Sequence, residues 1–262
     1  MNRKDGWDPR QYLKFASERT RPCHDLAGHV SLSDVRRVID LGCGPGNSTE
    51  VLVSRWPRAE VAGLDNSAGM IETARQSHPD RRWILHGIAD WAATADEQFD
   101  LVFSNAALQW VGDHDVLFPR LLERVVPGGA LAVQMPCGFN TPGQRLMHEL
   151  ATSPPWVHKF PSEGVRQWHV RDIDFYYDLL APRTVALDFW KTDYLHILPN
   201  AEAIVEWYKG TALRPFLDAL ESAADKEQFT SEYLELIRPY YPPHPDGRVL
   251  LPFPRMFLIA YR

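Results

Sequence analysis

The sequence lacks the features of secreted, membrane-spanning and zinc-binding proteins. Its three cysteines, Cys23, Cys43 and Cys137, are scattered and form no CxxC pair, which argues against a disulfide framework or a zinc site and favours a reducing compartment. No apolar run approaches the roughly 18 residues of a membrane helix, and the stretch MNRKDGWDPRQYLKF at residues 1–15 contains no apolar signal segment. We therefore expect a cytoplasmic protein that does not span a membrane.

The sequence also lacks an excess of positive charge and any metal-binding histidine motif. The 28 Lys and Arg against 34 Asp and Glu give a net charge of −6, so we expect no nucleic-acid partner. None of the ten histidines forms an HExxH motif or another ligand pair at helical spacing, so we expect no metal site. The 262 residues, 45% of them apolar, suffice for the core of one large domain with insertions.

What the sequence does contain, from Val38 to Pro136, is an alternation of short apolar runs and longer amphipathic segments. This pattern predicts βαβ units and a doubly wound α/β fold with a mostly parallel sheet. The predicted strands cover residues 38–41, 60–65, 82–87, 99–104 and 130–135. The predicted helices cover residues 49–55, 68–76 and 116–125, and the sequence PGG at 127–129 ends the last of them.

After Pro136, helical segments replace the strict alternation of short apolar runs and amphipathic segments. Predicted helices cover residues 141–151, 172–180, 201–220 and 226–240, and Gly210 interrupts the third of them. Two more strands, at residues 187–195 and 249–261, complete a predicted sheet of seven strands. The helical insertions before these strands are rich in aromatic residues, and we expect them to cover the C-terminal edge of the sheet as a cap.

The stretch VIDLGCGPGNS, from Val38 to Ser48, places three glycines at alternate positions after the first predicted strand. Gly42, Gly44 and Gly46 indicate a backbone that another group approaches closely. A glycine-rich turn at this place in a doubly wound sheet is where nucleotide-type cofactors bind, because the next helix offers free N–H groups. A tight turn without a ligand is the alternative.

The spacing of this motif separates two classes of cofactor. The dinucleotide fingerprint is GxGxxG, whereas this loop reads GxGxG with Asn47 at the next position. Asp40, two residues before Gly42, would repel a pyrophosphate but suits the sulfonium and ammonium groups of S-adenosylmethionine. The loop therefore favours S-adenosylmethionine, with S-adenosylhomocysteine as product, over NAD.

Further candidate contacts to this cofactor follow the next predicted strands. Asp65 ends the second strand and can accept both ribose hydroxyls, a feature that both cofactor classes share. Asp90 is placed to accept the adenine amine, and Met70 or Trp91 can pack on the ring, with a core position as the equal alternative for Trp91. Asn105 follows the fourth strand, where the methionine end would lie. The candidate cofactor residues are Asp40, Gly42, Gly44, Gly46, Asp65, Asn66, Met70, Asp90, Trp91, Asn105 and Arg21.

These motifs resemble those of the class I S-adenosylmethionine-dependent methyltransferases, and nearly the whole chain resembles their trans-aconitate 2-methyltransferase family. The general motifs are VIDLGCGPGNST, GLDNSAGMI, SNAALQWVGDH and LAVQMP, and the narrower resemblance rests on YLKFASERTRP, YYDLL, KGTALRPFL and FPRMFLIA. Two positions depart from the family pattern. Ala212 replaces the glycine of TGLRP, and CGFNTPGQ replaces the usual DNxxEP type after Pro136.

The resemblance implies a Rossmann-like methyltransferase domain over residues 1–262. Residues 30–136 would form the cofactor-binding half, and residues 137–185 and 199–247 would form the helical cap that binds the substrate. The implied substrate is a small anionic carboxylic acid, trans-aconitate, which would be converted to a monomethyl ester.

An acidic protein must hold such an anion with a few local cations. Arg214 and Arg255 lie among apolar residues, in LRPF and FPRMF, where an isolated guanidinium is costly unless it is paired. A surface salt bridge is the alternative for either arginine, and Arg21 could hold the cofactor's own carboxylate. Tyr176 and Tyr177 point to different faces of a helix, so we expect only one to reach the ligand. The candidate substrate residues are Tyr12, Gln109, Trp110, Tyr177, Lys209, Arg214 and Arg255.

We expect no catalytic side chain, despite the nearby His114. A carboxylate is already a nucleophile at neutral pH, so the enzyme has only to align it, and alignment supplies effective molarities of about 10⁵–10⁸ M. Three alternatives remain at this point. They are a methyltransferase for another small acid or a hydroxylated metabolite, an NAD-dependent oxidoreductase, and a non-catalytic protein that senses the cofactor.

Overall fold

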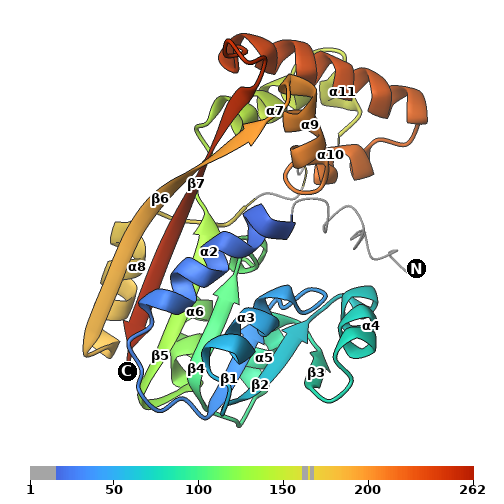
Figure 1. The fold of residues 1–262 in the computed structure, drawn as a ribbon. Coiled ribbons are helices and arrows are strands. Elements are labelled where there is room, and N and C mark those ends of the chain that lie inside the picture. The colour runs from blue at the N-terminus through green and yellow to red at the C-terminus, as the bar shows by residue number, and fades with distance from the viewer. Residues whose placement is uncertain (1–15, 161–164, 166–167) are drawn as a thin grey trace. The chain divides into compact units, whose positions relative to one another are not determined.

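The computed structural model describes residues 16–160, 165 and 168–262, which divide into two compact units (Figure 1). The first, here called the sheet unit, comprises the described residues of Met1–Pro136, Trp168–Thr192 and Arg255–Arg262. The second, here called the helical unit, comprises those of Cys137–Gln167 and Asp193–Pro254. The two long C-terminal strands therefore contribute residues to both units.

The strands form one seven-stranded sheet in the order β3-β2-β1-β4-β5-β7-β6. The first five strands along the chain pair in parallel, and β7 is antiparallel to β5. This confirms the predicted doubly wound, mostly parallel sheet of a Rossmann-like fold. The strands are β1 Arg37–Leu41, β2 Glu60–Asp65, β3 Arg82–Leu85, β4 Phe99–Asn105, β5 Val125–Pro136, β6 Ala186–Leu198 and β7 Val249–Tyr261.

Helices cover both faces of the sheet in the sheet unit. Figure 1 shows α2 and α3 on one face and α6 and α8 on the other. Because both faces are covered, the central strands are continuous apolar runs, and Val38, Ile39 and Leu41 of β1 have no exposed surface. The helices of this unit are α2 Ala16–His29, α3 Asn47–Arg55, α4 Ala68–Ser77, α5 Ile88–Thr94, η1 Leu108–Trp110, α6 His114–Glu123, α8 Ile173–Leu180 and η3 Ala181–Arg183.

Aromatic side chains form the core of the helical unit. The ring of Trp156 packs edge-on against Phe229, with 5.0 Å between centroids. The hydroxyl of Tyr233 donates to the Gly143 carbonyl at 2.7 Å, and the Gly143 N–H donates to the Tyr241 hydroxyl at 3.0 Å. The helices of this unit are α7 Pro142–Thr152, η2 Trp156–His158, α9 Ala201–Lys209, α10 Arg214–Ala219, α11 Ala223–Ile237 and η4 Arg238–Tyr240.

Two parts of the sheet unit differ from the sequence prediction. Helices α2 and α5 were not predicted, and the segment from Val125 to Gly129 is strand rather than the end of a helix and a turn. The reason for the second difference is a pairing that is distant in sequence. The Gly128 N–H donates to the Arg262 carbonyl, and the Arg262 N–H donates to the Gly129 carbonyl, so the last residue of the chain extends the ladder along this segment.

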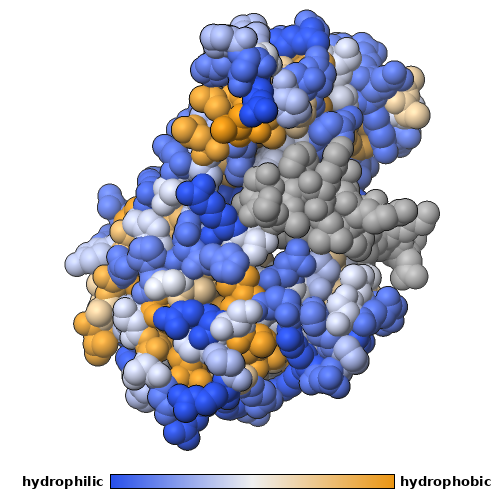
Figure 2. Space-filling model, viewed as in Figure 1, coloured by the Kyte–Doolittle hydropathy of each residue, from blue (hydrophilic) through white to orange (hydrophobic). Residues whose placement is uncertain are grey.

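The visible surface is mainly hydrophilic, with hydrophobic residues in separate patches (Figure 2). Among the described helices, none has both the length and the apolar character that crossing a membrane requires.

Candidate active site

The glycine loop joins β1 to α3, and its backbone is left-handed at all three glycines, with φ of 74° at Gly42 and 54° at Gly44. A Cβ added to Gly42 would lie 2.1 Å from the Cβ of Ala107, so this glycine is needed for packing within the protein. A Cβ added to Gly44 would meet no atom within 4 Å. Gly44 is therefore the glycine whose missing side chain leaves space that a ligand can use.

Asp65 connects this loop to the next helix. One carboxylate oxygen accepts the Gly44 N–H at 2.9 Å, and the other accepts the Ser67 N–H at 2.8 Å. Ser67 in turn caps α4 through the Met70 N–H. These backbone donors fix the orientation of the carboxylate at the edge of the glycine loop.

Asp40 lies beneath the loop and is completely buried. Its Oδ2 accepts the hydroxyls of Ser48 at 2.6 Å and Thr49 at 2.7 Å, and in the described part of the chain its Oδ1 has no hydrogen-bond partner. Burial raises the pKa of Asp40 to about 6, although the two hydroxyls act in the opposite direction. Asp40 thus holds the first turn of α3 from below, and its predicted contact with the cofactor stays a prediction.

A pocket opens beside the glycine loop within the sheet unit. Its lining residues are Thr20, Cys23, Gly42, Cys43, Asn47, Ser48 and Asn105. Two of these, Gly42 and Asn105, were predicted as cofactor residues. The sequence analysis missed Thr20 and Cys23 because they lie on α2, which was not predicted.

The polar groups of this pocket and of the adjoining glycine loop suit a ligand with hydroxyl and ammonium groups. The Oδ1 atom of Asn105 is buried and, among the described residues, accepts no hydrogen bond, so a ligand donor would satisfy it. Gly44 leaves open space and Asp65 presents a negative charge. These three observations fit S-adenosylmethionine, whose ribose hydroxyls and ammonium group are donors.

The residues predicted at the adenine end differ in exposure. Asn66 and Asp90 are exposed and accessible to a ligand. Met70 and Trp91 are 4% and 7% exposed, and the Trp91 ring lies 6.0 Å from that of Phe99. Trp91 thus occupies a core position, which was the alternative to its predicted contact with the adenine ring. The predicted Arg21 is exposed on α2.

A second group of buried polar side chains lies where β4 and β5 end. The backbone of Ala106 is left-handed, with φ of 57°, and its N–H donates to the Gln134 carbonyl at 2.9 Å. The side-chain amide of Gln109 donates to the Ala106 carbonyl at 2.7 Å, and the guanidinium of Arg255 donates to Oε1 of Gln134 at 3.4 Å. The structure therefore brings two predicted substrate residues, Gln109 and Arg255, into one bonded cluster with Gln134.

Two other predicted substrate residues, Lys209 and Arg214, belong to the helical unit. Lys209 pairs with Glu206 at 2.7 Å and Arg214 with Asp218 at 3.4 Å. Tyr177 is 54% exposed, and its ring lies 6.5 Å from that of Phe189 on β6, so its predicted contact with the substrate stays a prediction. Tyr12 lies outside the described residues.

Trp110 and His114 flank the loop that carries Gln109. The ring of Trp110 meets Trp168 edge-on, with 6.0 Å between centroids. His114 is buried, its Nε2 lies 3.0 Å from the Leu108 carbonyl, and its Nδ1 lies 2.7 Å from the hydroxyl of Tyr176. Burial lowers the pKa of His114, which favours a neutral ring that donates from Nε2 and accepts at Nδ1. His114 therefore fixes this loop, and both of its ring nitrogens are engaged.

Comparison with known proteins places this geometry in a family. Residues 38–129 match the model of a methyltransferase domain. The trans-aconitate 2-methyltransferase of Azoarcus sp. strain BH72 is 47% identical over 98% of this chain and 99% of that protein. The protein of that name from Rhodopseudomonas palustris strain BisB18 is 46% identical over 98% of this chain and 99% of its own. Phosphoethanolamine N-methyltransferase 2 of Haemonchus contortus, solved with S-adenosyl-L-methionine, has a TM-score of 0.58 at 15% identity and covers 100% of this chain and 60% of its own.

The parallel sheet, the glycine loop and the matching domain model define a class I S-adenosylmethionine-dependent methyltransferase. The identity over nearly the full length narrows this class further. The chain belongs to the trans-aconitate 2-methyltransferase family, which confirms the resemblance seen in the sequence and removes the NAD-dependent oxidoreductase from consideration.

Proposed function

We propose that the protein transfers the methyl group of S-adenosylmethionine to a carboxylate of trans-aconitate and releases a monomethyl ester. The observation that carries this proposal is the position of Arg255. Arg255 is 6% exposed, and its guanidinium contacts Gln134, which is the register partner of the pocket residue Asn105. A buried cation next to the cofactor pocket suits an anionic acceptor better than a neutral one.

The residues of the glycine loop bind and orient the cofactor in this proposal. Asp65 accepts hydrogen bonds from the ribose hydroxyls, and Gly44 leaves the backbone accessible. Asn105 accepts a hydrogen bond from the methionine portion. When bound, S-adenosylmethionine supplies an electrophilic methyl group on a positively charged sulfur.

The chain itself needs to do little chemistry. A carboxylic acid is ionised at neutral pH, so the attacking oxygen requires no general base. The protein has to align the reacting oxygen and exclude water, since the opposite charges neutralise each other during transfer and a desolvated site favours that neutralisation. A cation on the reacting carboxylate would weaken the nucleophile, so Arg255 is assigned to a carboxylate that is not methylated.

We further propose that the reaction takes place in the cytoplasm, because Cys23, Cys43 and Cys137 form no disulfide. The test is methyl transfer from labelled cofactor to a panel of di- and tricarboxylic acids and hydroxylated metabolites, with mass analysis of the products. We expect trans-aconitate to give the highest kcat/KM and a singly methylated ester. A higher kcat/KM for a neutral hydroxylated acceptor would overturn the proposal.

A further inference from the structure

Three polar side chains form a row across neighbouring strands of the sheet unit. Asn105 on β4 and Gln134 on β5 are register partners, so their Cα atoms are about 4.8 Å apart and their side chains share a face. Arg255 on β7 lies two residues from Phe257, the partner of Gln134. Arg255 is therefore the diagonal neighbour of Gln134 on that same face, within reach of a long side chain. We call Asn105, Gln134 and Arg255 the polar row.

The face that carries the polar row is the one covered by α2. The ring of Phe257 stacks on Trp190 at 4.7 Å, and Trp190 stacks in turn on His29 of α2 at 4.4 Å. Cys23 of α2 lines the cofactor pocket together with Asn105. One end of the polar row therefore lies in the cofactor pocket, and the row leads from there to the guanidinium of Arg255.

The orientation of the Gln134 amide follows from its neighbour. Arginine has only donors, so the Gln134 oxygen faces Arg255 and the amide nitrogen points away from it. Gln134 has no exposed surface, and among the described residues its Nε2 has no hydrogen-bond partner. A buried amide donor without a partner is uncommon in a folded protein and calls for a physical reason.

The atoms around the Gln134 amide indicate which kind of group would satisfy its donor. Gln134 places an uncharged amide against the guanidinium of Arg255. A donor without a partner beside a cation is the arrangement that a carboxylate oxygen satisfies. We infer that Gln134 and Arg255 together bind a carboxylate of the acceptor that is not methylated. We infer further that Gln134 makes the site select acceptors that carry this second carboxylate. This inference rests on the proposed function and adds Gln134 to its site.

Two substitutions test the role of Gln134, and Met135→Leu is the control. Met135 is the next residue on β5, is equally buried and faces the opposite side of the sheet. Gln134→Met removes the donor while keeping the volume. We expect KM for the acid to rise roughly 10- to 100-fold, as for the loss of a hydrogen bond to a charged group, with kcat changed less than about threefold and cofactor affinity unchanged.

The second substitution, Gln134→Glu, separates a binding role from a structural one. A glutamate would form an ion pair with Arg255, so the fold should be at least as stable as the wild type. Because that pair removes the cation from the substrate, we expect KM to rise by more than roughly 100-fold. A stable Gln134→Glu protein with the KM of the Met135→Leu control would overturn the inference.

A measurement on the wild-type protein tests the same inference without any variant. Each carboxylate of trans-aconitate is replaced in turn by an uncharged amide. We expect one amide to abolish methylation, because it removes the acceptor, and another to raise KM by a factor similar to that of Gln134→Met. If the amides that are still methylated all keep the KM of trans-aconitate, the inference is wrong. Failure of the wild type to methylate trans-aconitate would instead contradict the proposed function.

Discussion

The two units each contain an arginine that the sequence singled out for the substrate, and the two arginines differ in their surroundings. Arg255 of the sheet unit is buried against the uncharged amide of Gln134. Arg214 of the helical unit is 23% exposed in its side chain and lies 3.4 Å from the carboxylate of Asp218, four residues along the same helix. An uncharged amide leaves the positive charge of a neighbouring guanidinium in place, whereas a neighbouring carboxylate offsets part of it.

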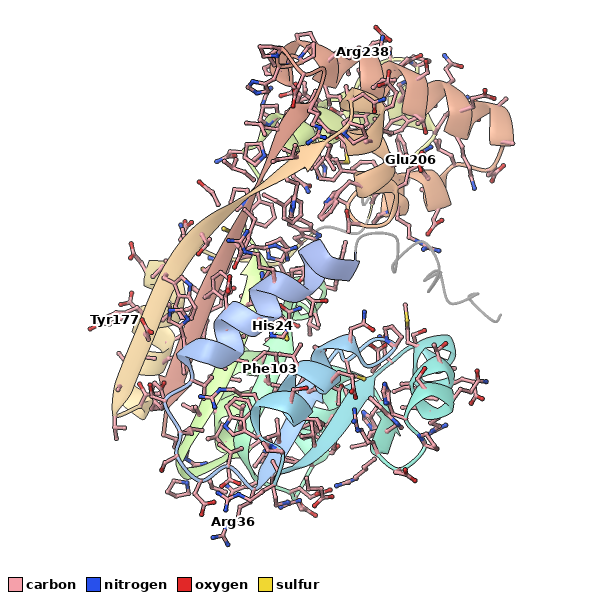
Figure 3. All side chains as sticks on the ribbon, in the orientation of Figure 1. His24, Arg36, Phe103, Tyr177, Glu206 and Arg238 are labelled. Atoms are coloured by element: carbon pink, nitrogen blue, oxygen red, sulfur yellow. The ribbon has the colours of Figure 1, made fainter. Side chains whose placement is uncertain are left out.

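Among the described residues, both units contain buried polar atoms without a hydrogen-bond partner, such as Nε2 of Gln144 in the helical unit. In the helical unit, Lys209 pairs with Glu206 (Figure 3 labels Glu206 on α9), and the Tyr233 hydroxyl donates to a backbone carbonyl. In the sheet unit, Asn105 and Gln134 each bury a polar atom that has no partner among the described residues. In the proposed site, the cofactor and the anchoring carboxylate of the acceptor are both held by the sheet unit.

The largest effect is expected for the glycine loop. Gly44 and Gly247 are both left-handed, with φ of 54° and 81°, and a Cβ at either would meet no atom within 4 Å. Valine at each position therefore causes similar backbone strain. Gly44→Val should abolish cofactor binding, while Gly247→Val in the helical unit should not, as measured by calorimetric titration. Normal cofactor binding by Gly44→Val would show that the loop does not contact the ligand.

The next effect concerns two aspartates that accept backbone N–H groups two residues ahead. Asp65 accepts from Ser67 in the sheet unit, and Asp246 accepts from Arg248 in the helical unit. Asp65→Ala should weaken S-adenosylmethionine binding by about 1.5–3 kcal/mol, the range for a hydrogen bond to a charged group. Asp246→Ala removes the same type of turn contact without a cofactor role. Equal cofactor affinities of the two variants would contradict the ribose assignment.

A smaller effect is expected in the pH dependence of stability. The folded state raises the pKa of Asp40 from 3.8 to about 6, so it binds the proton more tightly than the unfolded chain does. The contribution of Asp40 to stability therefore falls as pH rises from about 4 to about 6 and stays low above that. Asp40→Asn should gain up to about 1–3 kcal/mol relative to the wild type between pH 4 and pH 7. Urea unfolding at both pH values checks this, and a constant difference would contradict it.

Acids of the helical unit should behave in the opposite way. The guanidinium of Arg238 lowers the pKa of Glu202, and the ammonium of Lys159 lowers the pKa of Asp225. The stabilisation from these pairs is present above the ordinary carboxyl pKa and is lost as pH falls. Glu202→Gln should therefore be less stable than the wild type above the ordinary carboxyl pKa, and this difference should disappear as pH falls. The difference between Asp40→Asn and the wild type should instead grow as pH rises.

The sequence predicted the sheet because buried parallel strands are continuous apolar runs that are recognisable one by one. Helix α2 was missed because Pro22 lies inside it, although its buried residues Cys23, Leu26 and Ala27 recur at helical spacing. The start of β5 was missed because its PGG sequence is typical of a turn, whereas pairings with Phe99 and Arg262, which are distant in sequence, make it a strand.

The candidate site likewise contains residues that short sequence motifs predict and residues that only the fold brings together. The glycine loop and Asp65 were predicted from adjacent residues, since their chemistry depends on short spacing. Gln134 carried no signal, because a single glutamine in an apolar strand has no meaning until the register of β5 with β4 and β7 is known. The Arg255 cation was predicted from its residue type, and its amide partner required the fold.

The most direct test of the comparison between the units is to measure kcat/KM for trans-aconitate in Arg255→Met and Arg214→Met side by side. Methionine retains much of the apolar packing of the arginine stem and removes the charge. The account predicts a fall of about two to three powers of ten for Arg255→Met, equivalent to about 3–4 kcal/mol, less than about tenfold for Arg214→Met, and unchanged cofactor affinity for both. A loss in Arg214→Met that equals or exceeds the loss in Arg255→Met would contradict it.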